Sequence, residues 1–148
     1  MKLLRIAVVG IGTNESSRAR AYLNVISRLK EYYTLCALCD QNKEKLNLVG
    51  KQFGVKALYT ELENMLVSEK PDVVFALVPT DGQSVIALTA ARKGCNIITE
   101  IPYAITLEIG DAIAKVCEEK NVKWEIAENV WRWPNEKLKQ KVVKSGII

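Results

Sequence analysis

The chain has 148 residues, of which 49% are hydrophobic and 26% are charged, and its net charge is +4. These proportions are those of an ordinary globular domain, which at this length buries roughly 70% of its unfolded surface. No apolar run reaches the ~18 residues of a membrane span. The lysines are interleaved with acidic residues, which predicts solvated helix faces and no nucleic-acid or membrane partner. Met1 to Leu4 lead at once into an apolar run, too soon for a signal peptide, so we predict a cytoplasmic protein.

Short apolar runs predict strands at Leu3–Val9, Thr34–Cys39, Asp72–Val78, Asn96–Thr99 and Val122–Ala127. Helical patterns fill the segments between and after them. Their predicted limits are Ser16 or Ser17 to Leu29, Asn42–Phe53 before Gly54, Thr60 to Leu66 with Glu63 completing a capping box, Ser84–Lys93 before Gly94, Thr106 to Cys117, and Pro134–Lys144. This alternation predicts an α/β fold: a doubly wound, mainly parallel sheet with helices on both faces, as in Rossmann-like domains.

Cys36 and Cys39 form a Cys-x-x-Cys pair inside the second predicted strand. Positions three apart on a strand point to opposite faces, so we expect that the two sulfurs cannot share a metal. A redox pair would instead lie at a helix N-terminus. Cys95 and Cys117 show no pairing pattern. All four are predicted to be reduced thiols, and no metal site is predicted.

Gly10-Ile11-Gly12 ends the first apolar run and is the most informative segment of the chain. Glycine permits a sharp turn and a close approach of the backbone to a ligand. Asp40 ends the second apolar run, where a dinucleotide site needs an acceptor for ribose hydroxyls. The combination predicts NAD binding; NADP stays possible, although a carboxylate there would repel its 2′-phosphate. The alternative is a tight strand end, with Asp40 capping the turn before Asn42.

Pro79, Thr80 and Glu100 follow two further predicted strands. Ligands bind at the carboxyl ends of strands in open α/β sheets, so these residues are candidates for the site, with a plain loop as the alternative. Asn129 and Arg132 either line a cleft or brace a hinge. We interpret three tryptophans as core or interface residues and not as a stacking platform: Trp124, Trp131 and Trp133.

These motifs resemble the N-terminal half of the Gfo/Idh/MocA oxidoreductases. The resemblance extends over the whole chain and rests on Gly10-Ile11-Gly12, Asp40, Val78-Pro79-Thr80, Glu100-Ile101-Pro102 and Glu128-Asn129-Val130-Trp131-Arg132-Trp133-Pro134. It implies a dinucleotide-binding domain over residues 1–130. Residues 131–148 would be a connecting segment and helix toward a C-terminal domain that binds a sugar or polyol. Apolar residues near the end of the chain, Trp131, Trp133, Ile147 and Ile148, would then be uncovered. This predicts self-association as a homo-oligomer or poor solubility, or else a chain that is a piece of a longer protein.

The glycine motif departs from the family pattern because Glu15 stands at the third small position. That position serves close packing of the helix on the sheet. We expect Thr13-Asn14-Glu15 to be an insertion, with Ser16 or Ser17 taking the small position. If Glu15 instead lies over the pyrophosphate, it would repel the ligand, and Arg18 or Arg20 would offset the repulsion.

The second departure is Ile101, which stands where the family has the lysine of Glu-Lys-Pro. The resemblance implies that this lysine contacts substrate and nicotinamide, and isoleucine can neither donate a hydrogen bond nor carry charge. Tyr103 is the nearest replacement donor. The chain also lacks histidine, and Gln83 falls where the family often has one.

The resemblance and the residues together predict the NAD(P)-binding domain of an oxidoreductase that acts on a sugar or polyol by hydride transfer. A non-catalytic dinucleotide sensor or subunit is the alternative, and a binder of another nucleotide is a third. The chain by itself is predicted to be inactive, with no catalytic residue. The predicted cofactor-binding residues are Gly10, Ile11, Gly12, Thr13, Asn14, Asp40, Gln41, Val78, Pro79, Thr80, Glu100 and Asn129.

Overall fold

The computed structural model describes residues 3–147, apart from the side chain of Trp131. The predictions made for the side chains of Trp131 and Ile148 therefore lie outside the described residues. Within them, one sheet has the strand order β3-β2-β1-β4-β5-β6, and all its neighbours are parallel. Its strands are β1 (Leu4–Val9), β2 (Tyr33–Cys39), β3 (Leu58–Tyr59), β4 (Val73–Ala76), β5 (Asn96–Thr99) and β6 (Trp124–Ile126). The predicted parallel sheet is confirmed.

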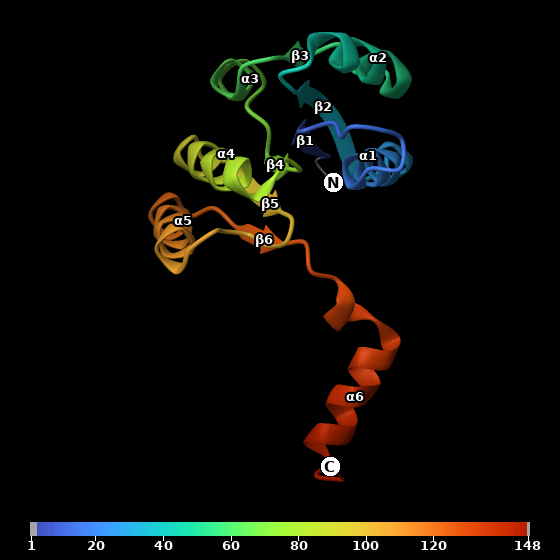
Figure 1. Cartoon of the computed structure of the whole chain (residues 1–148), viewed down its shortest axis with the longest axis vertical. Coiled ribbons are helices and arrows are strands. Elements are labelled where there is room, and N and C mark those ends of the chain that lie inside the picture. Colours follow the sequence, from blue (N-terminus) through green and yellow to red (C-terminus); the bar gives the residue numbers. More distant parts are fainter. Residues whose placement is uncertain (1–2, 148) are drawn as a thin grey trace.

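Helices cover both faces of the sheet (Figure 1). On one face α1 (Arg18–Arg28) and α2 (Lys43–Phe53) bury a cluster that includes Leu23 and Leu46. On the other face α3 (Leu62–Glu69), α4 (Thr80–Arg92) and α5 (Leu107–Lys120) bury a second cluster, which includes Met65 and Ile113. This is the predicted doubly wound arrangement. The strand order reverses between β1 and β4, so the carboxyl ends of these strands form the expected ligand crevice.

Several predicted element limits are wrong. Strand β4 ends at Ala76 and not at Val78, and helix α4 begins at Thr80 and not at Ser84. The reason is Pro79, which has the extended backbone of an N-cap residue, so the helix starts directly after it. The segment between strand and helix is therefore a short turn.

The predicted capping box at Thr60 is also absent. Glu61 is the N-cap residue of α3, its side chain makes no capping bond, and the helix continues to Glu69. The chain enters the helix from β3, which is only two residues long and was not predicted. By contrast, Thr106 caps α5 by accepting from Ile109 N, as predicted. Asn42, predicted as the first residue of α2, is its N-cap and accepts from Lys45 N.

The prediction that Cys36 and Cys39 point to opposite faces is wrong. Ile6 pairs with Leu35 but Ala7 pairs with Ala37, so β2 has a bulge at Cys36. A bulge breaks the two-residue alternation of a strand. Both side chains consequently pack on the α3–α5 side of the sheet. All four cysteines are free thiols, and residues 3–147 contain no group of three or more potential metal ligands.

Helix α6 (Pro134–Lys144) has the predicted limits and follows the short 3-10 helix η1 (Val130–Arg132). It extends away from the sheet and its covering helices (Figure 1), and none of its described residues is buried. Across residues 3–147 no helix has the length and apolar character needed to cross a bilayer.

Candidate functional site

The turn after β1 is built on two glycines with positive φ, Gly10 at 86° and Gly12 at 78°. A Cβ atom at Gly10 would lie 2.5 Å from the carbonyl oxygen of Leu77, and one at Gly12 would lie 1.9 Å from Ser17 Oγ. The turn thus packs directly on the end of β4 and on the N-cap of α1. Ser17 occupies the small-residue position expected for it, and Glu15 lies on an exposed turn away from the cavities described below.

Asp40 ties the turn after β1 to the turn after β2. One carboxylate oxygen accepts from Ile11 N at 3.0 Å, and the other accepts from Asn42 N at 2.9 Å. The turn role considered for Asp40 is therefore present. A carboxylate oxygen can accept more than one hydrogen bond, and Asp40 also lines two cavities, so it has the capacity for a contact with ribose hydroxyls.

Three cavities follow one another along the carboxyl ends of the strands. The outer one, of about 580 Å³, lies between the ends of β1 and β2 and the starts of α3 and α4. The middle one, of about 330 Å³, is bounded by the glycine turn and the start of α1. The inner one, of about 250 Å³, is bounded by the start of α4 and the segment after β5. Because Val78 and Pro79 line all three, the cavities are neighbours, and together they are called the groove below.

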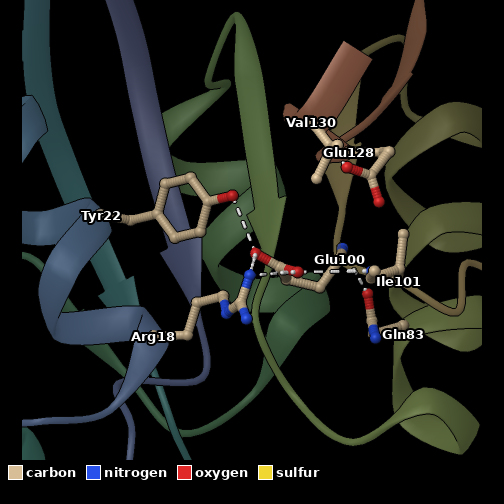
Figure 2. Close-up of polar contacts among 7 residues, drawn as sticks. All are labelled: Arg18, Tyr22, Gln83, Glu100, Ile101, Glu128 and Val130. Atoms are coloured by element: carbon tan, nitrogen blue, oxygen red, sulfur yellow. Dashed lines mark hydrogen bonds and ion pairs between the residues drawn. The ribbon is translucent and has the colours of Figure 1, made fainter. Parts of the chain in front are cut away.

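Glu100 is the centre of a polar cluster at the inner cavity (Figure 2). Its side chain is only 11% exposed. Tyr22 Oη donates to Glu100 Oε1 at 2.8 Å, and Arg18 Nη1 lies 3.3 and 3.4 Å from the two carboxylate oxygens. Gln83 Oε1 accepts from the Glu100 backbone N at 2.7 Å. Gln83 is itself buried, so the residue at the position of the family histidine contacts the site as a hydrogen-bond acceptor.

The phenol of this cluster is Tyr22 and not Tyr103. The ring of Tyr103 instead packs edge-on against Trp124 at 5.3 Å between ring centroids, so it is not the replacement donor considered above. Burial, and then the hydrogen bond with Glu100, raise the pKa of Tyr22 to about 12. Tyr22 therefore remains a protonated donor throughout the physiological pH range.

Ile101 follows Glu100, joins Pro102 through a cis peptide bond and lines the inner cavity with an exposed side chain. It brings no charge. Trp124, for which a core role was predicted, is partly buried and donates through Nε1 to Thr99 Oγ1 at 2.9 Å. Trp133 is exposed.

The structure brings together most of the predicted cofactor residues. Those that line the groove are Gly10, Gly12, Thr13, Asp40, Gln41, Val78, Pro79, Thr80 and Glu100. Ile11 is fully buried and reaches the site through its backbone alone. Asn14 accepts from Ser16 N within its own turn. Asn129 lies elsewhere, in a separate apolar groove of about 450 Å³ beside α1 and β6, which Arg132 also lines.

Sequence reasoning missed the part played by Tyr22. Ser17 lines the middle cavity, but its hydroxyl is buried beside Gly12 and has no hydrogen-bond partner among the described residues. No local signal marks such roles, because they depend on which elements meet. Arg20, one of the two proposed cations, is buried and donates to Ile11 O and Gln52 Oε1 instead. Only the other, Arg18, lines the groove.

This groove can accommodate an extended anionic ligand. Gly10 and Gly12 hold the turn close against β4 and the start of α1, and both line the middle cavity together with the cation Arg18. An extended nucleotide with its phosphates at the glycine turn fits these features. Fold and groove together define a Rossmann domain of the dinucleotide-binding class.

Comparison with known proteins agrees with this class. A model of the Gfo/Idh/MocA oxidoreductase family, described as having an NAD-binding Rossmann fold, matches residues 4–127. The chain therefore belongs to the Gfo/Idh/MocA oxidoreductase family, and the cofactor class of this domain is NAD(H).

Among curated relatives, D-apiose dehydrogenase of Paraburkholderia graminis is 28% identical over 133 residues, which cover 90% of this chain and 34% of that protein. D-glucoside 3-dehydrogenase of Escherichia coli is 28% identical over 105 residues, which cover 71% of this chain and 29% of that protein. The chain thus spans about one third of the length of the curated relatives that it matches.

Solved structures show the same fold. The WlbA dehydrogenase of Bordetella pertussis, in complex with NADH and UDP-GlcNAcA, has a TM-score of 0.88 and 23% identity, and the match covers 98% of this chain and 43% of that one. Scyllo-inositol dehydrogenase of Lactobacillus casei, with bound NAD(H) and scyllo-inositol, has a TM-score of 0.88 and 19% identity. This match covers 99% of this chain and 42% of that one.

Proposed function

We propose that this domain binds NAD(H) along the groove and presents the nicotinamide to a sugar or polyol, held by a second domain of the family. The observation that carries the proposal is the row of neighbouring cavities at the switch between β1 and β4, bounded by the glycine turn and Asp40. The adenosine end would lie in the outer cavity, the phosphates at the glycine turn, and the nicotinamide in the inner cavity. When bound, the nicotinamide supplies hydride transfer.

NAD is favoured over NADP because Asp40 lines the outer and middle cavities. Its carboxylate suits free ribose hydroxyls and repels a 2′-phosphate. Lys45 lines the middle cavity together with Asp40 and supplies a positive charge there, so NADP would be bound more weakly but not rejected outright.

Adding NAD⁺ or NADH to the chain is expected to raise its melting temperature, because a ligand that binds only the native state stabilises it. At 100 times Kd the stabilisation is about 2.7 kcal/mol. Differential scanning fluorimetry measures the shift, and adenosine alone at the same concentration is the control. If millimolar NAD⁺ and NADH both leave the melting temperature unchanged, the proposed function is wrong.

A non-catalytic sensor or subunit is the second candidate, favoured by Ile101 at the position of the family lysine and by a sequence without histidine. The two candidates differ in the turnover of the complete protein with sugars and NAD⁺. For the sensor we expect turnover only after Ile101→Lys. An unmodified protein that already turns over sugars would eliminate the sensor.

The remaining proposals concern organisation. We propose that residues 1–130 are the dinucleotide-binding domain and that 131–148 lead toward a substrate domain, because α6 is exposed along its length. Self-association is proposed because Trp133 and Ile147 expose 56% and 75% of their surfaces, and light scattering after size exclusion measures it. A cytoplasmic location is proposed from the four free thiols.

A further inference from the structure

Arg18 lies where the middle and inner cavities meet. It is the first residue of α1, directly after Ser17, and it lines both cavities. Its side chain is 64% exposed, so the guanidinium is accessible from the groove. Its contacts with the described residues are both made by Nη1 to Glu100, which leaves Nη2 and Nε as donors for a ligand.

The cluster around Glu100 holds the guanidinium in this place. A carboxylate buried as deeply as that of Glu100 requires charge or hydrogen-bond partners, and it has Arg18 and Tyr22. Tyr22 is anchored in turn by its ring, which packs edge-on against Phe75 at 5.5 Å. Figure 2 shows Tyr22 and Arg18, both from α1, pointing toward the same carboxylate.

The positive charge at the inner cavity therefore comes from α1. Arg18 is the cation among its lining residues and Glu100 the anion, while Ile101 contributes an apolar side chain. A guanidinium group is always positively charged in proteins and does not transfer protons to or from a substrate. It does match phosphate oxygens in geometry and charge. These properties suit a residue that binds phosphate and do not suit an acid or base.

Building on the proposed function, we propose that Arg18 is a binding residue for the dinucleotide pyrophosphate. It would contact the phosphate on the nicotinamide side, across the middle cavity from the glycine turn. Glu100 and Tyr22 then act as positioning residues for Arg18. This assigns a function to the buried acid of the Glu100-Ile101-Pro102 segment that does not need a lysine at position 101.

The test compares Arg18→Gln with Arg28→Gln, an exposed arginine in the last turn of the same helix. Calorimetric titration with NAD⁺, ADP-ribose and adenosine measures affinity. Arg18→Gln is expected to lower the affinity for NAD⁺ and ADP-ribose by at least tenfold and the affinity for adenosine by less than twofold. Arg28→Gln is expected to change none of these affinities. Arg18→Lys retains the charge but not the fork of donors, so its affinity for NAD⁺ and ADP-ribose is expected to fall threefold to tenfold.

The outcomes separate the inference from the proposed function. If the unmodified chain binds NAD⁺ and Arg18→Gln binds it equally well, the inference is wrong and the proposed function stands. If Arg18→Gln and Arg18→Lys both lower the affinity for adenosine as much as the affinity for NAD⁺, Arg18 acts on the fold and not on phosphate. That result also overturns the inference. If the unmodified chain binds neither NAD⁺ nor ADP-ribose, both proposals fail together.

Discussion

Replacing Gly10 with alanine is expected to destabilise the chain by about 2–5 kcal/mol and to abolish NAD binding. The positive φ of 86° costs an L-residue about 1–2 kcal/mol. The new Cβ atom would lie 2.5 Å from the carbonyl oxygen of Leu77 and 2.6 Å from Val78 Cγ1. Because one obstacle is backbone, relief requires β1 and the end of β4 to separate, and such overpacking costs about 1–3 kcal/mol.

Urea denaturation of Gly10→Ala beside Gly54→Ala separates the two contributions. Gly54 also has positive φ, at 70°, but a Cβ atom there would meet nothing within 4 Å. The stability of Gly54→Ala is therefore expected to fall only by the cost of the strained backbone, about 1 kcal/mol, and its affinity for NAD is expected to stay the same. Equal losses in the two variants would show that close packing at Gly10 contributes nothing.

Replacing Asp40 with alanine is expected to weaken NAD binding by at least tenfold and NADP binding by less. The carboxylate holds Ile11 N and Asn42 N, so its loss loosens the glycine turn for either ligand. Leaving these donors unsatisfied costs about 1–3 kcal/mol each where they are buried. The ribose contact would be lost for NAD alone, and the repulsion of the 2′-phosphate would disappear for NADP.

The ratio of the two affinities therefore carries the information on the ribose. Titration of Asp40→Ala with NAD⁺ and NADP⁺ measures it, and Asp111→Ala, an exposed acid on α5, is the matched control. A parallel fall of both affinities would assign Asp40 to the turn only. Asp40→Asn, which keeps an acceptor but no charge, is expected to change the ratio with a smaller loss of stability.

Because Ile101 stands at the position of the family lysine, another group of the site would have to take the role of that lysine. The Glu100 carboxylate and the Arg18 guanidinium line the inner cavity, and the Tyr22 phenol lies beside it; both of the others are engaged with the carboxylate. None of them is free to transfer a proton without breaking that cluster.

Local patterns predicted the fold of this chain and much of its site. The alternation of apolar runs and helical stretches, the glycines after β1 and the polar residues after each strand act over a few positions, so they are legible in the sequence. Thr106 and Pro134 begin their helices as predicted for the same reason. The wrong helix and strand limits lie in the turn at 77–79 and around β3, where packing outweighs weak local preference.

Only the tertiary structure decided which side chains meet. Glu100 contacts Arg18 and Tyr22 across sequence separations of 82 and 78 residues, and the bulge at Cys36 depends on the register with β1. Such contacts follow from the way the helices pack on the sheet. The sequence by itself determined a doubly wound domain with a glycine turn at its switch point, because periodicity and turn chemistry are local. The charge of the inner cavity and the partner of its buried acid were decided by packing between distant elements.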